Sequence, residues 1–318
     1  MRGSRMSATP NHFAADYQQG RLTADLSTSL SAIRQAAESS EPQMPGQTQF
    51  NLDGQTGIAS LDVWVQAVYT SIDDDRAGLD ANSTFGLYYL GVDMMASENL
   101  LIGALLQWDH AETVTGTYRS EVSGDGWLAG PYVVARLADN VYFDARGAWG
   151  QSENDVNPIG LYVDSFDTSR WLLEANLTGE INSGNWRVSP KLGIAYFNEE
   201  QTAYTDTLGF LIPGQEITLG RINAGPEIAY RFIGSEGGYF EPYIRLTALW
   251  DYDDADVYNA AGNLQGIGGL RADARLGVTA ELPNGGLISG EVGIIGLGLG
   301  DFEANNAMIR IRLPLSMQ

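Results

Sequence analysis

The sequence predicts an all-β transmembrane barrel of twelve antiparallel strands with one α-helix ahead of it, and three observations lead to this prediction. From Gly57 almost to the C-terminus, apolar and polar residues alternate with the period of two that is typical of β-strands. Short turns and long loops alternate between these strands. Aromatic and charged side chains fall on opposite faces of the same strands.

Composition limits the class of protein. The chain has 318 residues, no cysteine and a formal net charge of −22, which argues against a nucleic-acid partner and leaves no disulfide or thiolate chemistry. No stretch approaches about 18 uninterrupted apolar residues, so a membrane-spanning helix is excluded. Met1–Ser4 resembles an expression-vector leader and no signal-peptide core follows, so we expect the natural targeting sequence to lie upstream.

Residues 22–57 are expected to form a helix and a connector, separate from a polar, irregular segment at 1–21 and a barrel at 58–318. Between residues 22 and 39 an apolar stripe recurs at helical spacing, and proline residues follow it. The stripe consists of Leu22, Leu26, Leu30, Ile33 and Ala37. Small polar side chains on the other faces suit a helix threaded through a wet, narrow pore. A frayed linker helix is the alternative.

The alternating pattern predicts strands at 58–70, 83–95, 99–110, 124–138, 140–151, 166–182, 185–199, 216–232, 239–252, 267–282, 286–299 and 305–315. An even number is expected when a bacterial barrel starts and ends on the same side of the membrane.

The connections between these strands favour a barrel over a β-sandwich. Every second connection is a short turn, found around Ser97-Glu98, Asp139-Asn140, Ser183-Gly184, 234–238 and 283–285. The other connections are loops of about 12 to 16 residues. Short periplasmic turns and long extracellular loops are typical of outer-membrane barrels, whereas a sandwich mixes lengths and adds Greek-key crossings.

The hairpin at 170–199 indicates which face points outward. Trp186 and Tyr196 lie on its apolar face ten residues apart, which is about 25 Å along a tilted strand and matches the height of a lipid-facing band. An ordinary sandwich strand, with this face in a core, is the alternative for one hairpin alone. Applied to all strands, the same parity places aromatic residues outward as membrane-interface girdles: Tyr69, Trp108, Trp127, Trp149, Trp171, Trp186, Tyr196, Tyr230, Phe232, Phe240 and Trp250.

The opposite face is expected to line the pore, and it carries twelve of the 18 basic residues. The predicted pore-lining residues are Arg136, Arg146, Arg170, Glu174, Arg187, Lys191, Arg221, Glu227, Arg231, Glu241, Arg245, Arg271, Asp273, Arg275, Glu291, Arg310 and Arg312, with Asp144 beside them. Charges are costly toward lipid and can pair in a wet lumen. These charged residues either form ion pairs across strands that stabilise the barrel, or they hold a helix in the pore and ease the passage of a polypeptide through it.

Several motifs resemble the translocator barrel of autotransporters, the type V secretion class. The most extended runs from Trp186-Arg187-Val188-Ser189-Pro190 through Tyr196 to Tyr204-Thr205-Asp206. The others are Leu90-Gly91-Val92-Asp93, Gly103-Ala104, Gly130-Pro131-Tyr132, 271–277 and Gly296-Leu297-Gly298. The similarity covers about residues 58–315, and the order of the motifs makes it specific.

The resemblance implies a helix inside the pore, an outer-membrane location and export of an upstream passenger to the cell surface. The segment 7–21 would then be the remnant of that passenger. Barrel-assembly machinery, periplasmic chaperones and outer-membrane lipid are the implied partners, and a monomer is implied. The chain departs from the family at its end, where Leu315 and Ser316-Met317-Gln318 stand in place of a terminal Phe or Trp that assembly machinery reads.

No enzyme, cofactor or metal site is expected. The two histidines are His12 and His110, and Asp109-His110 is only a distant match to the acid–histidine sites of outer-membrane proteases. Acidic clusters at Asp73–Asp75 and Asp251–Asp256 are expected in extracellular loops, without the spacing of a calcium loop. The alternatives to a translocator are a porin for small solutes, with the helix outside the lumen, and a soluble β protein.

Overall fold

The computed structural model describes residues 61–75, 80–116, 120–158, 160–234, 238–254, 257–258, 264–265, 270–282, 285–300 and 302–315. The helix expected at 22–39 and the connector after it lie outside these residues. Within the described part of the chain, no helix is long and apolar enough to cross a membrane.

Twelve long strands and several short ones make up the described chain. The long strands are β1 (Leu61–Asp74), β2 (Ala81–Ser97), β3 (Leu100–Thr115), β4 (Ser120–Ala138), β5 (Val141–Asn157), β6 (Asp164–Gly179), β8 (Trp186–Gln201), β11 (Gln215–Tyr230), β13 (Tyr239–Asp254), β16 (Leu270–Glu281), β17 (Leu287–Leu297) and β18 (Phe302–Leu315). The short strands are β7 (Ile181–Ser183), β9 (Tyr204–Thr205), β10 (Leu211–Ile212), β12 (Phe232–Ile233), β14 (Val257–Tyr258) and β15 (Leu264–Gln265).

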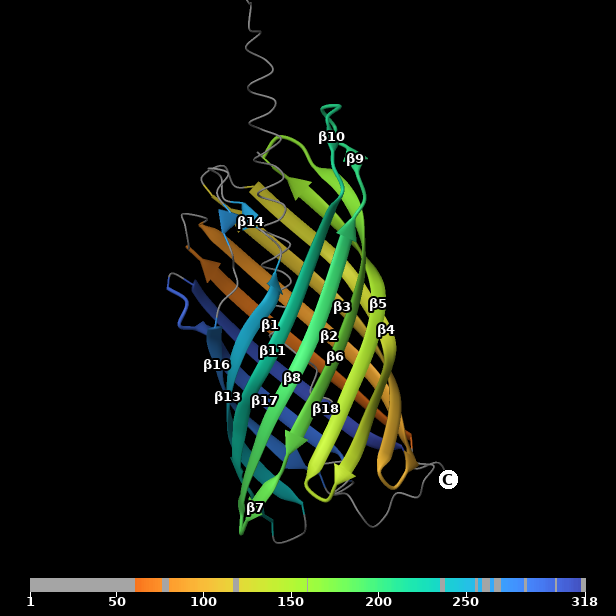
Figure 1. The fold of residues 1–318 in the computed structure, drawn as a ribbon, viewed down its shortest axis with the longest axis vertical. Helices are drawn as coiled ribbons and strands as arrows, with labels where there is room; N and C mark the ends of the chain where they lie inside the picture. Colours follow the sequence, from red (N-terminus) through yellow and green to blue (C-terminus); the bar gives the residue numbers. More distant parts are fainter. Residues whose placement is uncertain are drawn as a thin grey trace, which may run out of the picture.

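The twelve long strands close into one antiparallel barrel with tilted walls (Figure 1). Each long strand pairs with its neighbours in the chain, and β1 pairs with β18 along its whole length, from Leu61↔Leu315 to Asp74↔Phe302. All long strands of the wall therefore have partners on both sides, which satisfies the backbone hydrogen bonds without water. The predicted twelve-stranded antiparallel barrel is confirmed.

The strands extend further at the long-loop end than the sequence predicts. β3 ends at Thr115 rather than 110, and β5 ends at Asn157 rather than 151. The predicted loop length is therefore wrong for three connections, which span only 75–80, 116–119 and 158–163. The physical reason is that the strands continue above the aromatic residues with polar side chains on their outer face, so the apolar–polar contrast fades before pairing stops. The other two, 202–214 and 255–269, are long and contain the hairpins β9–β10 and β14–β15.

The acidic clusters are also placed differently from the prediction. Asp73 and Asp74 belong to β1, and Asp251 belongs to β13 with its side chain buried in the barrel. The expectation of loop positions for these residues is wrong, because Asp251 pairs with arginines inside the wall rather than with solvent. Among the described residues, no group of three or more His, Asp or Glu side chains is arranged to hold a metal ion.

The barrel interior as candidate functional site

A chain of ion pairs runs across the inner face of one side of the barrel. We call it the charged ladder, and it consists of Arg231, Glu241, Arg187, Glu227, Arg245, Glu291, Arg275 and Asp273. These residues come from β8, β11, β13, β16 and β17, with Arg231 directly after β11. Alternating side-chain direction brings them together, because every second residue of neighbouring strands points inward.

Each glutamate of the ladder joins two arginines. Glu241 lies 2.7 Å from Arg231 and 2.5 Å from Arg187. Glu227 lies 2.9 Å from Arg187 and 2.7 Å from Arg245, so Arg187 joins the two glutamates. With four arginines and four carboxylates, the ladder is electrically balanced. Such pairing offsets much of the cost of placing charges inside the wall.

The ladder continues from β13 to β17. Arg245 lies 3.1 Å from Glu291, which also accepts a hydrogen bond of 2.9 Å from the Tyr243 hydroxyl. Arg275 lies 3.4 Å from Glu291 and 3.5 Å from Asp273. These longer distances mark the looser end of the ladder.

Smaller groups hold the other predicted charges inside. Arg221 and Arg271 share Asp251, with 2.6 Å between Arg221 and the carboxylate. Arg146 and Glu174 pair at 2.6 Å, and so do Arg170 and Asp109. Beside Glu174, Asn176 donates to Asp144 at 2.8 Å. Arg312 pairs with Asp62.

Three predicted pore-lining residues have different surroundings. Arg310 lies over the Trp64 ring, 4.8 Å from its centroid, which is a cation–π contact. Arg136 donates to the Asn99 side chain in the short β2–β3 turn, so the structure places it at the rim of the barrel. Lys191 is half-buried on β8.

The other side of the interior is apolar, which the sequence prediction missed. We call this surface the apolar half; it consists of Trp64, Val68, Ile72, Phe85, Leu87, Tyr89, Leu101, Leu105, Ala111, Tyr132, Val134, Tyr142, Ile295, Ala304 and Met308, from β1–β5, β17 and β18. The expectation that the whole inner face is polar is therefore wrong. A signal was present, since runs such as Leu100–Leu106 are apolar at both parities.

Trp64 anchors the apolar half. Its side chain is 0% exposed, and its indole N–H donates to the Tyr132 hydroxyl at 2.8 Å, which donates to Asp93 at 2.5 Å. The indole lies on Gly91, where a Cβ atom would come within 2.1 Å of the ring. Only glycine leaves room for the indole at this position.

The outer face is apolar and carries the aromatic residues. Trp108 faces Trp127 across β3 and β4, and Trp149 faces Trp171 across β5 and β6, all four exposed toward the long-loop end. Trp250, Tyr69 and, half-buried, Tyr196 also point outward there. At the short-turn end Trp186, Tyr230, Phe232 and Phe240 form a chain of ring contacts 4.8 to 6.3 Å between centroids.

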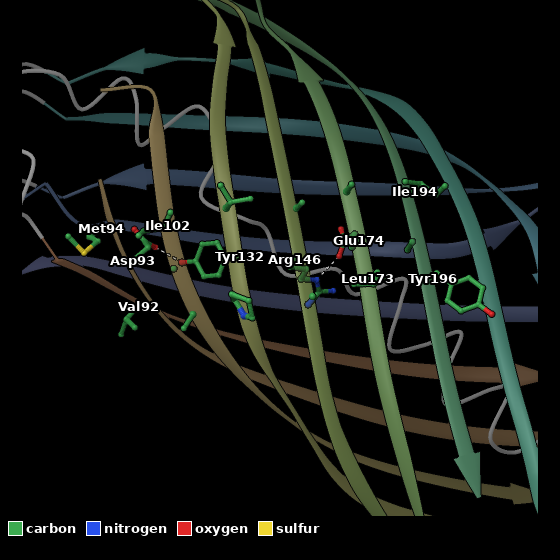
Figure 2. A pocket seen from close by; sticks show the side chains of 18 of the residues that line it. Val92, Asp93, Met94, Ile102, Tyr132, Arg146, Leu173, Glu174, Ile194 and Tyr196 are labelled. Carbon is green, nitrogen blue, oxygen red and sulfur yellow. Dashed lines mark hydrogen bonds and ion pairs between the residues drawn. The ribbon is translucent and has the colours of Figure 1, made fainter. Parts of the chain in front are cut away.

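An apolar groove crosses this outer face from β2 to β8 (Figure 2). Its floor is made of small residues, Ala104, Pro131, Ala145, Gly147 and Ala175, and exposed side chains such as Ile102 and Leu173 border it. The Arg146–Glu174 pair lies behind this floor, directed into the barrel. Tyr196 and Tyr252 also line the groove, which belongs to the largely apolar outer surface.

Asp109 and His110 do not form a catalytic pair. They are adjacent in β3 and therefore point to opposite faces: Asp109 holds Arg170 inside, and His110 lies 2.8 Å from Asp125 outside. The structure thus separates the one acid–histidine neighbour pair that the sequence offers.

A closed barrel with an apolar exterior, aromatic residues near both ends and ion pairs inside defines a transmembrane β-barrel. A family model for the autotransporter beta-domain matches residues 63–293, and the chain belongs to this family. It is an autotransporter translocator domain of the bacterial outer membrane, a type V secretion barrel that transports rather than catalyses, and the family implies an attached passenger.

Solved structures show the same fold. The transport unit of AIDA-I from Escherichia coli aligns at 14% identity and a TM-score of 0.71, covering 91% of this chain and 98% of that one. The beta domain of Bordetella BrkA aligns at 15% identity and a TM-score of 0.65, covering 80% of this chain and 99% of that one. The NalP translocator domain from Neisseria meningitidis aligns at 14% identity and a TM-score of 0.61, covering 92% of this chain and 96% of that one. An outer membrane channel from Pseudomonas putida F1 aligns at 12% identity and a TM-score of 0.51, covering 86% of this chain and 99% of that one. No curated protein matches the chain.

Proposed function

We propose that residues 22–39 cross the lumen as a helix that closes the pore after the passenger has been exported. The observation that carries the proposal is the two-sided interior. An apolar stripe of five residues, Leu22, Leu26, Leu30, Ile33 and Ala37, matches the apolar half, and the small polar side chains on its other faces match the charged ladder. A helix of 18 residues is about 27 Å long, comparable with the wall formed by β1.

In this proposal export and closure use the same lumen. Barrel and passenger assemble together, the passenger leaves as a hairpin, and the helix remains behind as its last segment. The charged ladder stays paired within the wall, so a passing polypeptide meets balanced charges rather than a single sign. Residues 7–21 carry the end of the passenger, and residues 40–57 connect the helix to the barrel.

The remaining partners follow from the outer face. We propose that the two aromatic girdles lie at the two membrane interfaces and that outer-membrane lipid covers the surface between them. Barrel-assembly machinery and periplasmic chaperones would deliver the chain, which inserts as a monomer.

Conductance across a planar bilayer tests the helix. The intact chain should conduct weakly, and deletion of residues 1–50 should raise the conductance severalfold, because the lumen then fills with water. The matched control removes residues 1–21 alone, which keeps the helix and should leave the conductance low. Equal conductance of all three proteins would reject the plug.

A porin-like channel for small solutes is the second candidate, favoured by the likeness to the Pseudomonas putida channel fold. It predicts high, unchanged conductance in the intact chain and in both deletions. The same experiment therefore separates the two functions.

A further inference from the structure

Two neighbouring connections at the extracellular end are joined into one unit. The backbone N–H and the side-chain hydroxyl of Thr207, in the β9–β10 hairpin, both donate to Asp164 at the start of β6, at 2.8 and 2.6 Å. The unit presents five apolar side chains that are 40% to 81% exposed. We call this surface the apical platform: Leu161 and Val163 before β6, and Leu208, Phe210 and Leu211 on the hairpin.

The platform has a packed base. The Phe166 and Tyr204 rings stack with centroids 5.7 Å apart, over a buried cluster that contains Val156 and Ile217. Burial, followed by the charges of Asp164 and Asp206, raises the pKa of Tyr204 to about 12, which is consistent with its packing against this base. The exposed side chains are therefore held on a fixed support.

The hairpin turn is fixed as well. Asp206 accepts a hydrogen bond of 2.6 Å from the Phe210 backbone N–H, and its carbonyl accepts one of 3.0 Å from Gly209. Gly209 has a φ of 85°, a left-handed conformation that a side chain would strain. The turn holds Leu208 and Phe210 in place without help from a partner.

The platform stands above the membrane. Asn157, the last residue of β5, lies eight residues beyond Trp149, which corresponds to about 20 Å along a tilted strand. Figure 1 shows the β9–β10 hairpin at the upper end of the described barrel. Acyl chains end near the tryptophan girdle, so they cannot cover this surface. A fixed apolar surface in water is typical of a protein contact.

We propose that the apical platform binds the chain's own segment 7–21, the part of the passenger that leads into the pore helix, through Phe13 and Tyr17. This inference rests on the proposed lumen helix. β1 starts at the short-turn end, so a helix of about 27 Å places Arg21 near the extracellular mouth. Phe13, eight residues further, can reach up to about 27 Å from Arg21.

Charge favours the same occupant. Within residues 7–21, Arg21 balances the single Asp16, so the segment is electrically neutral in a chain whose overall net charge is −22. The strands under the platform expose Asp155, Glu200 and Glu216, and Glu200 lies directly opposite Glu216. A neutral segment adds no further negative charge to these strands. A second copy of the barrel would bring the same acidic strands together.

Engineered cysteines test the contact, since the chain contains no cysteine of its own. The full chain with Phe13→Cys and Leu208→Cys should form an intramolecular disulfide under mild oxidation. The control carries Phe13→Cys with Asn82→Cys, an exposed position at the same end on β2, and should cross-link far less. The proposal would be overturned if both proteins cross-linked equally, or if the protein with Phe13→Cys and Leu208→Cys formed no disulfide. It would also be overturned if the disulfide linked two chains into a dimer.

Trypsin gives a second measurement that does not require a new bond. Cleavage after Arg21 should accelerate severalfold when Leu208, Phe210 and Leu211 are all changed to serine. The control Ile233→Ser removes an exposed apolar side chain at the opposite end and should leave the rate unchanged. Unchanged cleavage in the triple variant contradicts the proposal.

The two proposals can fail separately. If removal of residues 1–50 raises conductance but neither the cross-link nor the change in cleavage appears, the lumen helix stands and the platform contact is wrong. If conductance does not change, the lumen helix is wrong, whatever the cross-link shows.

Discussion

The two sides of the barrel interior accommodate their buried side chains in different ways. The apolar half packs aromatic and aliphatic side chains around Trp64, as the core of a soluble protein does. The charged ladder carries arginines and carboxylates that neutralise each other from strand to strand, with Glu241 only 2% exposed. The difference shows that the lumen is not uniformly wet. It has one side that suits an apolar stripe and one side that suits polar side chains.

The two halves also differ in how they should respond to a change. Truncation of a packed apolar side chain lowers the free energy of unfolding gradually, in proportion to the volume of the cavity that it leaves. Removing one carboxylate from a buried ion-pair chain has a larger effect, because it leaves buried arginine charge with less compensation.

The largest effect is expected in the charged ladder. Glu241→Ala should destabilise the barrel by about 3–5 kcal/mol, because Arg187 and Arg231 both lose their shared partner. Urea unfolding in detergent, followed by the heat-dependent gel mobility of the barrel, measures the change. Glu303→Ala, on the exposed outer face of β18, is the control and should cost less than about 0.5 kcal/mol. Similar losses in both variants would show that the ladder adds nothing beyond surface charge.

Truncation in the apolar half should cost somewhat less. Leu87→Ala should destabilise by about 2–4 kcal/mol, since Leu87 is completely buried and the substitution leaves a cavity. Leu90→Ala on the same strand is the control: Leu90 faces outward, where detergent or lipid fills the space. Equal losses at the two positions would mean that the apolar half is not packed as a core.

The smallest effect is expected outside the barrel, where carboxylates oppose one another. Glu153 lies directly between Asp125 on β4 and Asp167 on β6. Glu153→Gln should therefore stabilise the barrel by about 0.2–1 kcal/mol at low salt. The control Glu112→Gln lies between Thr84 and Ser123 and should have no effect. Destabilisation by Glu153→Gln would indicate that this row of carboxylates binds something that stabilises it.

The sequence was sufficient to predict the strands of the barrel wall but not the contacts in its interior. Alternation and turn chemistry predicted all twelve long strands, because pairing in a closed sheet depends on local period and connection length. The same parity placed Trp186 outside and Arg187 inside, as their exposure shows. Which arginine meets which carboxylate depends on stagger between strands, so the bridge from Arg187 to Glu241 could not be predicted.

The apolar half was missed for a related reason. Val68 and Leu87 lie on the inner parity of strands whose outer parity is also apolar, so alternation carries no contrast there. The ends of the strands were missed because their outer residues become polar above the girdle. The hydrogen bond from Thr207 to Asp164, which joins the two connections that carry the apical platform, links residues 43 positions apart, and no local pattern reports such a contact.

The most direct measurement of the account asks which half the pore helix faces. Leu30→Cys should be combined in turn with Val68→Cys, in the apolar half, and with Arg245→Cys, in the charged ladder at a similar position along its strand. Mild oxidation of the full chain in membranes should give a disulfide with the Val68 position and little with the Arg245 position. A preference for the Arg245 position, or no disulfide with either, would contradict the account.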